Sequence, residues 1–307
     1  MKVEHCCRMS AIIPRVSQLS PLVTRVLGCN PGHMTLQGTN TYLVGVGKSR
    51  LLVDTGERGV GEYIDNLQGT LRDQEAGIGK ILLTHWHHDH VGGVRDVLAG
   101  RATRDIVLYK FPRTETRSSV WGSVPGGEAN VGEASLEGVD VVELSDGEVV
   151  EVEGARLRVV HTPGHTTDHV VLHLEEEGSV FSGDCILGEG TAVFEDLFDY
   201  MQSLDKILQL QPTRIYPGHG PVIEDPLPKI RQYIQHRNLR EGQILDCLKS
   251  SSCPLSSMEI VKNVYRETPE KLHRAAEINV QNHLTKLYRE NKVDILKEHK
   301  KWSFIQD

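Results

Sequence analysis

The sequence contains no long apolar run, no internal repeat and few cysteines. None of its stretches approaches eighteen consecutive apolar residues, which argues against a membrane-spanning helix and a membrane partner. The lack of heptads, repeats and low-complexity segments argues against a coiled coil, a solenoid or extensive disorder. Six scattered cysteines in 307 residues are too few for a disulfide-stapled fold, so we expect a reducing compartment.

Acidic residues are missing from the N-terminal region, between Glu4 and Asp54. The same stretch contains five basic residues, and basic segments without acidic residues are typical of mitochondrial targeting peptides. No Arg-rich amphipathic helix stands out, however, and residues 22–27 alternate like a β-strand. We therefore expect a mitochondrial or a cytosolic protein, with a flexible N-terminal segment over residues 1–20.

Charge is unevenly divided along the chain. Residues 229–307 hold 15 Lys and Arg against 10 Asp and Glu, whereas residues 1–228 hold 19 basic and 32 acidic residues. A basic C-terminal region can be an ordinary solvated helical surface, or it can meet an anion such as a phosphate backbone.

Short apolar runs followed by Gly, Pro or Asp alternate with turns over residues 21–228. Runs of this kind are typical of β-strands, and they are found at residues 41–45, 50–53, 80–84, 155–160, 169–174, 179–182 and 214–216. We predict an α/β domain in which two mixed sheets pack together with helices outside.

Helical spacing replaces this pattern over residues 229–307. Ser256 and Glu259 have the spacing of a capping box, and Thr268-Pro269 is typical of a helix start. Val293 and Ile295 then alternate like a short strand. Three helices and a terminal strand predict a small winged-helix-like domain.

A dense group of metal-binding side chains follows the strand that ends near Leu83. The sequence there is H-x-H-x-D-H, formed by His85, His87, Asp89 and His90. Buried polar side chains this close together are costly unless one partner satisfies them jointly, and a divalent cation does so. The alternative, a fortuitous polar surface loop, fits poorly because a strand precedes the tract and glycines follow it.

Three more such residues lie on glycine-containing turns at strand exits: His165, Asp184 and His219. Glycine permits the sharp backbone that turns such a side chain inward. Five histidines and two aspartates together suit two metal ions with one shared carboxylate and an open position for water.

These motifs, with V-D-T-G at residues 53–56, P-G-H, G-D and P-G-H-G, resemble the metallo-beta-lactamase superfamily over about residues 20–225. The similarity is to its glyoxalase II-like branch and, when G-T-N-T-Y at residues 38–42 is included, most closely to an endoribonuclease of that branch. The resemblance implies a four-layer αββα fold, two zinc ions, cleavage of single-stranded RNA and a location in the mitochondrial matrix.

The resemblance also implies a role for each residue. His85, His87 and His165 would hold one zinc ion, Asp89, His90 and His219 the other, and Asp184 would bridge them. Asp54 would support the site by accepting the free N–H of a ligating histidine. A donor set without thiolate suits zinc and also iron or manganese, and histidine at position 87 argues against the di-iron relatives.

The function expected from these residues is hydrolysis of RNA by a zinc-bound hydroxide, with Asp89 or a bound water as the proton shuttle. Two alternatives remain open: a thioester hydrolase of the glyoxalase II type, and a non-catalytic RNA-binding protein with a relic metal site. We expect ordinary core or surface roles for the remaining residues of ligand type near these motifs: His88, His161, His169, His173 and Cys185.

Overall fold

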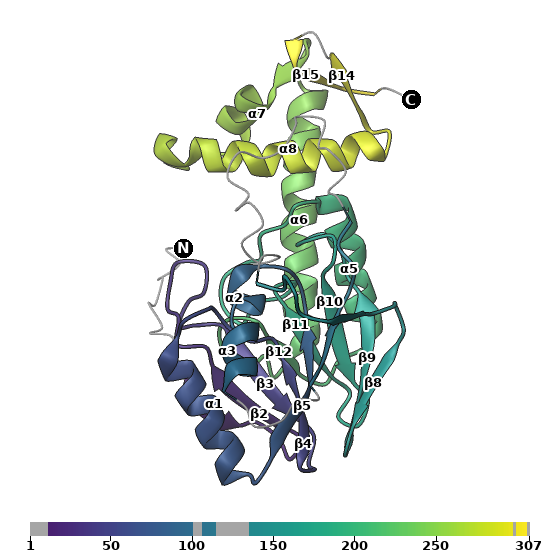
Figure 1. The fold of residues 1–307 in the computed structure, drawn as a ribbon. Coiled ribbons are helices and arrows are strands. Elements are labelled where there is room, and N and C mark those ends of the chain that lie inside the picture. The colour runs from purple at the N-terminus through teal and green to yellow at the C-terminus, as the bar shows by residue number, and fades with distance from the viewer. Residues whose placement is uncertain (1–11, 101–105, 115–134, 297–298, 306–307) are drawn as a thin grey trace.

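The computed structural model describes residues 12–100, 106–114, 135–296 and 299–305. Two β-sheets pack face to face in the larger domain, and helices cover their outer faces (Figure 1). One apolar cluster lies between the sheets, and a further cluster lies under the helices on each side. This four-layer αββα arrangement confirms the predicted fold class.

Within the described residues, the first sheet contains seven strands that lie side by side in chain order: β1 (Val16–Gln18), β2 (Val23–Leu27), β3 (Asn40–Val44), β4 (Ser49–Val53), β5 (Gly77–Leu83), β6 (Val107–Lys110) and β7 (Val141–Glu143). The second contains five, in the spatial order β12 (Ile215–Pro217), β11 (Ser179–Gly183), β10 (Val170–Leu174), β9 (Ala155–His161) and β8 (Val149–Val152). The helices of this domain are α1 (Gly61–Asp73), α2 (His88–Val91), α3 (Val94–Ala99), α5 (Leu197–Gln209) and the first half of α6 (Pro226–Lys249).

Parallel pairing brings together the strand ends that precede the candidate ligands. Strand β4 pairs in parallel with β5, and β11 pairs in parallel with β12. Because parallel strands end at the same edge of a sheet, the turns that follow β4 and β5 lie together, as do those that follow β11 and β12. The predicted apolar runs all coincide with strands, since each buries side chains in these layers.

The C-terminal domain contains the second half of α6, then β13 (Leu255–Ser256), α7 (Ser257–Val264), a 3₁₀ turn (Glu270–Leu272), α8 (His273–Arg289), β14 (Val293–Leu296) and β15 (Lys301–Phe304). Its described strands form one sheet in the order β13-β15-β14, packed on a core that includes buried Trp302. The capping box of Ser256 and Glu259 is confirmed. The helix expected from Pro269 begins at His273 instead, because Pro269 opens the 3₁₀ turn.

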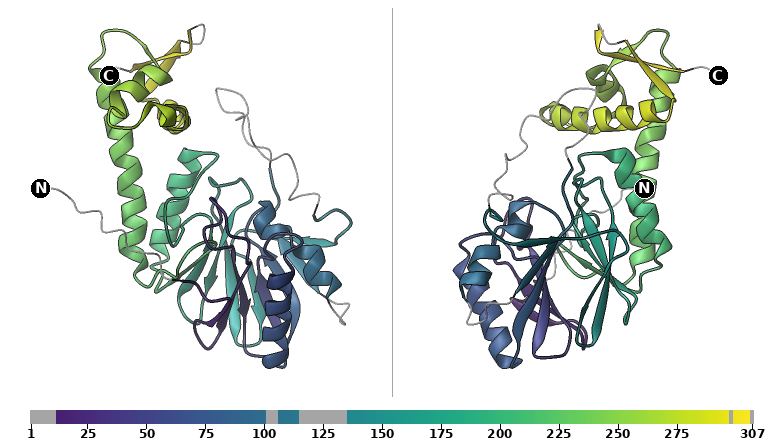
Figure 2. Two further views of the ribbon diagram at one scale, coloured as in Figure 1. Left: turned by 90° about the vertical axis from the view of Figure 1, so that its left-hand side faces the viewer. Right: turned by 45° about the vertical axis from the view of Figure 1, so that its right-hand side comes forward.

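Two elements of the structure lie at or near the predicted domain boundaries. Residues 1–11 lie outside the described residues, so the mitochondrial location stays a prediction. Residues 16–18, expected to be flexible, form β1 and pair with β2 at the edge of the first sheet. The boundary predicted between residues 228 and 229 falls inside α6, which runs from one domain into the other (Figure 2). Its Ile230 packs in the larger domain and its Ile244 in the smaller one.

The two domains also meet between α8 and the start of α5. The Arg289 guanidinium contacts the carboxylates of Asp196 (2.8 Å) and Asp199 (3.2 Å) and lies 4.0 Å from the ring centre of Phe198. Asp196 also caps α5 by accepting the backbone N–H of Asp199. None of the helices in the described part of the chain is long and apolar enough to cross a bilayer.

Glu241 is the main acidic partner of the buried cations in the C-terminal domain. Its carboxylate accepts from Lys286 Nζ at 2.6 Å and lies 3.9 Å from His283 Nδ1. Burial raises the pKa of Glu241, but His283 and Lys286 outweigh that effect and lower it to about 2. The stability that Glu241 contributes is therefore present above its unfolded pKa and lost as the pH falls towards 2.

We expect Glu241→Gln to lower stability at pH 7 by about 1 kcal/mol, because the more buried of the two carboxylates that contact Lys286 is lost. The difference in melting temperature between this variant and the wild type should shrink as the pH is lowered from 5 to 3. Glu267→Gln, at an exposed position between α7 and the 3₁₀ turn, serves as the control. A difference that stays constant over this range would contradict the assignment.

Candidate metal centre

The predicted ligands come from turns at neighbouring strand ends. Asp54 follows β4 and adopts a left-handed backbone with φ of 57°, and His85 follows β5. Asp184 follows Gly183, whose φ is 46°, at the end of β11. A Cβ atom at Gly183 would lie 2.7 Å from His169 Nε2, so glycine is required there. The strand pairing thus brings into one site side chains from Asp54 to His219, which are 165 positions apart in sequence.

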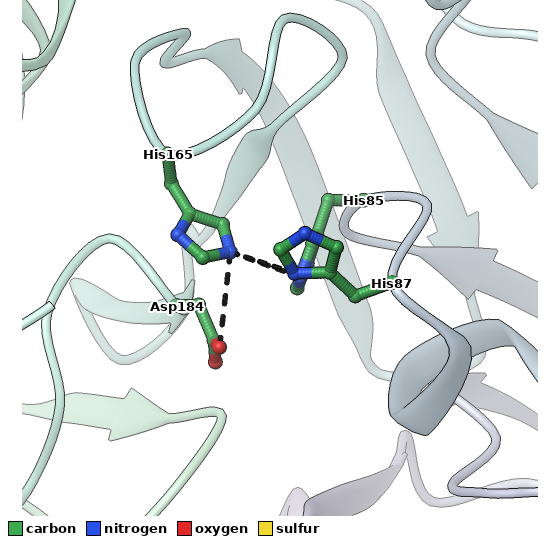
Figure 3. Close-up of side chains that lie close together, drawn as sticks. All are labelled: His85, His87, His165 and Asp184. Atoms are coloured by element: carbon green, nitrogen blue, oxygen red, sulfur yellow. Dashed lines mark hydrogen bonds and ion pairs between the residues drawn. The ribbon is translucent and has the colours of Figure 1, made fainter. Parts of the chain in front are cut away.

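Three imidazoles form the first group (Figure 3). His165 Nε2 lies 3.2 Å from His85 Nε2 and 3.0 Å from His87 Nδ1, and the last two atoms are 3.0 Å apart. Three nitrogens bound tetrahedrally to one zinc ion, at about 2.0–2.1 Å each, would be about 3.3 Å apart. The triangle therefore has nearly the dimensions that a metal ion imposes.

The outer hydrogen bonds fix which ring nitrogen carries the proton. His165 Nδ1 lies 2.7 Å from the carbonyl oxygen of Val193, which can only accept. The Thr84 hydroxyl donates to Asp54 and so accepts from His85 Nδ1, at 3.0 Å. Both rings thus keep their protons on Nδ1, and their Nε2 lone pairs face each other without a hydrogen between them.

The surroundings of this group keep its rings neutral. Burial, reinforced by the neighbouring histidines, lowers the pKa of His85 well below its usual value. Burial and His165 lower the pKa of His87 to about 3, and burial lowers that of His165. Neutral imidazoles with converging lone pairs are suited to bind a cation.

Asp89, His90 and His219 form the second group. His219 Nε2 lies 3.3 Å from His90 Nε2 and 3.2 Å from Asp89 Oδ2. Burial lowers the pKa of His219, but Asp184 and Asp89 outweigh it and raise the pKa to about 9. This half of the site therefore attracts positive charge, as expected for a buried pair of carboxylates.

Asp184 lies between the two groups. Its Oδ1 is 3.3 Å from His219 Nε2 and 3.4 Å from His90 Nε2, and its Oδ2 is 3.8 Å from His165 Nε2. Burial opposes ionisation of Asp184, but His219 and His90 lower its pKa well below the usual range. One carboxylate thus presents an oxygen to each group.

Asp54 makes the contact that the sequence predicts for it. Its Oδ2 accepts from His90 Nδ1 at 2.8 Å, which turns His90 Nε2 towards the second group. Thr84 holds the carboxylate in place, because its backbone N–H donates to Asp54 Oδ1 at 2.8 Å. His88, by contrast, lies at the surface near Glu57, and Cys185 is fully buried in an apolar cluster.

His169 contacts the turn that carries Asp184, which the sequence did not indicate. It lies directly before β10, fully buried, and its Nε2 accepts the backbone N–H of Asp184 at 3.2 Å. Its ring centre is 5.2 Å from that of His85. His169 is thus a core histidine, as expected, and it also fixes the backbone of the turn that carries Asp184. His161 instead stacks on Phe111, away from the metal-binding groups.

Residues 34–219 match the Metallo-beta-lactamase superfamily, and residues 256–302 match the Beta-lactamase associated winged helix domain. The chain is 52% identical to "Beta-lactamase-like protein 2 homolog" of Drosophila melanogaster, covering 94% of both chains. It is 45% identical to the Caenorhabditis elegans protein of the same name, covering 91% of this chain and 88% of that one.

A metallo-beta-lactamase family protein from Thermus thermophilus shares the fold, with a TM-score of 0.68 and 24% identity over 94% of this chain and all of that one. A further relative, 37% identical over 96% of this chain and 84% of its own length, is named "Atrochrysone carboxyl ACP thioesterase" of Passalora fulva.

The chain belongs to the metallo-beta-lactamase superfamily and carries the winged-helix domain associated with it. Members are typically metal-dependent hydrolases whose sites hold zinc or iron, and the histidine and aspartate cluster of this chain fits such a site. The closeness of the His85 and His165 lone pairs supports the same fit, since a cation between them removes their repulsion.

Metal binding should therefore stabilise the folded protein. We expect protein treated with a chelator to melt at a lower temperature than the same protein after addition of excess Zn²⁺, because only the folded chain assembles these donors. At a free concentration of 100 times Kd the gain is about 2.7 kcal/mol per site. His165→Asn should reduce the shift, whereas His173→Asn, in β10, should not. An unchanged melting temperature on metal addition would contradict the fit.

Proposed function

We propose that this protein is a two-zinc endoribonuclease that cleaves single-stranded RNA. The observation that carries the proposal is the arrangement of two ligand groups around one carboxylate, Asp184, whose two oxygens face different groups. In this proposal His85, His87 and His165 hold one zinc ion, while Asp89, His90 and His219 hold the other. The all-nitrogen-and-oxygen donor set supports zinc, with iron as the main alternative.

Two zinc ions bound here would supply a water molecule activated near neutral pH and would neutralise charge on a phosphate group. The chain itself fixes the ligands: Asp54 orients His90, and the Val193 carbonyl orients His165. Asp89 is the proposed proton shuttle, because its side chain is 10% exposed, whereas those of His90 and His219 are 0% and 2% exposed.

The substrate must reach a largely buried centre. His85 and His90 are fully buried, whereas His87 and Asp184 are only partly covered. A single strand can bring one phosphate to these two side chains more easily than a stiff duplex can. This restriction supports single-stranded RNA, in line with the similarity to endoribonucleases noted in the sequence.

Some of the basic residues in the C-terminal domain are available to guide such a strand. Arg289, Lys286 and Lys292 are occupied in ion pairs with acidic side chains. Lys271, in the 3₁₀ turn before α8, and Arg274, in the first turn of α8, are exposed. Within the described part of the chain, no acidic side chain forms an ion pair with them. We propose that these two residues attract the RNA backbone past the acidic larger domain.

Thioester hydrolysis is the second candidate, because one relative of similar length is named a thioesterase. The same metal centre could activate water for either substrate, so the ligands do not distinguish the two reactions. The substrate must therefore be tested directly.

The test compares a fluorescent single-stranded RNA, the matching duplex and an acyl thioester, each with zinc-loaded protein and with His85→Ala. We expect cleavage of the single strand only, with loss of activity in the variant. Thioester hydrolysis without RNA cleavage would favour the second candidate, and RNA binding without cleavage would favour a binding protein with a relic site.

The double variant Lys271→Glu/Arg274→Glu should reduce kcat/KM for single-stranded RNA several-fold at low salt. If each residue contacts one phosphate, the slope of log kcat/KM against log salt should become shallower by about 1.4. Lys48→Glu/Arg72→Glu is the matched control, since both residues are exposed at the far end of the first sheet. An unchanged salt slope in Lys271→Glu/Arg274→Glu would mean that these two side chains do not guide RNA.

A further inference from the structure

The segment that leads into β3 contacts two of the three residues in the second ligand group, Asp89 and His219. Thr39 Oγ1 lies 3.1 Å from Asp89 Oδ2, and Thr39 forms an isolated antiparallel bridge with His219. Thr39 and its neighbour Asn40 belong to the G-T-N-T-Y motif, whose polar residues are fully buried although the proposed metal ligands do not include them. Metal coordination alone therefore does not explain why these polar residues are buried next to the site.

The direction of the Thr39 hydroxyl is determined by its other partner. Asn30 Nδ2 donates to Thr39 Oγ1 at 3.1 Å, and Asn30 Oδ1 accepts the backbone N–H of Thr39 at 2.8 Å. Because Asn30 supplies a hydrogen to Oγ1, the hydroxyl hydrogen of Thr39 is free to donate to the Asp89 carboxylate. Asn30 thus fixes a donor that holds Asp89 Oδ2 in one orientation.

Asn40 holds the turn that carries His219. Its side-chain Nδ2 donates to the carbonyl oxygens of Pro217 and Gly220, each at 2.9 Å. Its backbone N–H donates to Gly218 at 2.7 Å. These bonds join the first sheet to the end of β12 in the second sheet, on both sides of His219.

The first ligand group depends on other segments. The ring N–H of His85 donates to Thr84, and that of His165 donates to Val193. Its geometry is thus set by β5 and by the loop before α5. Residues at the start of β3 can therefore affect the geometry of the second ligand group without affecting that of the first.

We propose that Thr39 is a positioning residue that sets the affinity of the second metal ion through Asp89. The proposal rests on the two-ion centre proposed above. Loss of the hydrogen-bond donor to Asp89 should lower the affinity for the second ion by about 10- to 100-fold. This range is typical of residues that orient metal ligands. The first ion should keep its affinity.

The experiment compares Thr39→Val with Thr39→Ser in the full-length chain. Valine has nearly the shape of threonine but no hydroxyl, and Asn30 Nδ2 keeps a second partner in Glu57 Oε2 at 3.3 Å. Serine keeps the donor. Metal-free protein is titrated with Zn²⁺ against a competing chelator, and the zinc bound per chain is measured by mass spectrometry after dialysis.

We expect two zinc ions per chain in the wild type and in Thr39→Ser. In Thr39→Val we expect one tightly bound ion and a second that is about 10- to 100-fold weaker. Two ions of unchanged affinity in Thr39→Val would overturn the role of Thr39 but leave the two-zinc centre intact. Fewer than two ions in the wild type would instead overturn the two-zinc centre, and this inference with it.

Asn30→Asp provides a second variant in case Thr39→Val fails to fold, as judged by its melting curve. The new carboxylate can no longer donate to Thr39 Oγ1 and draws the hydroxyl away from Asp89. We expect the same selective loss of the second ion, to a smaller extent. Retention of both ions at wild-type affinity in this variant would overturn the role given to Thr39.

Discussion

The closeness of the neutral imidazoles of His85, His87 and His165 is the constraint on which the site depends. Their nitrogens lie 3.0–3.2 Å apart, and the outer hydrogen bonds of His85 and His165 place lone pairs on the inner side. Such lone pairs repel one another in a buried site unless a cation lies between them. The surrounding turns and hydrogen bonds hold the donors in this arrangement. A bound metal ion would remove the repulsion between their lone pairs.

The winged-helix domain takes part in holding that arrangement. Arg289 of α8 contacts Asp196, and Arg237 of α6 donates to the carbonyl oxygen of Ala192 at 3.2 Å. Between these two points lies Val193, whose carbonyl oxygen accepts from His165. The smaller domain thus contacts the loop that orients one ligand, in addition to any role in binding substrate. The long helix α6 joins the two domains without a break, and its two halves pack in different cores.

The chain shares its superfamily with relatives whose names range from a beta-lactamase-like protein to a thioesterase. The candidate metal ligands lie on turns at the ends of the central strands, whereas the basic residues that we propose to guide the substrate lie on the C-terminal domain. A hydrolytic centre of this kind can serve a phosphodiester or a thioester, because both reactions need an activated water and a polarised electrophile.

The sequence by itself determined the strands and the αββα class and indicated the seven candidate donor residues, because alternating apolar runs and glycine turns such as Gly183–Asp184 are local signals. It also indicated the capping box of Ser256. It did not reveal the contacts of His169 with Asp184 and of Thr39 with Asp89, or the helix α6 that both domains share. These depend on contacts between segments far apart in the chain, which only strand pairing and packing bring together. Local patterns specify which way a side chain turns; the tertiary structure decides what it meets.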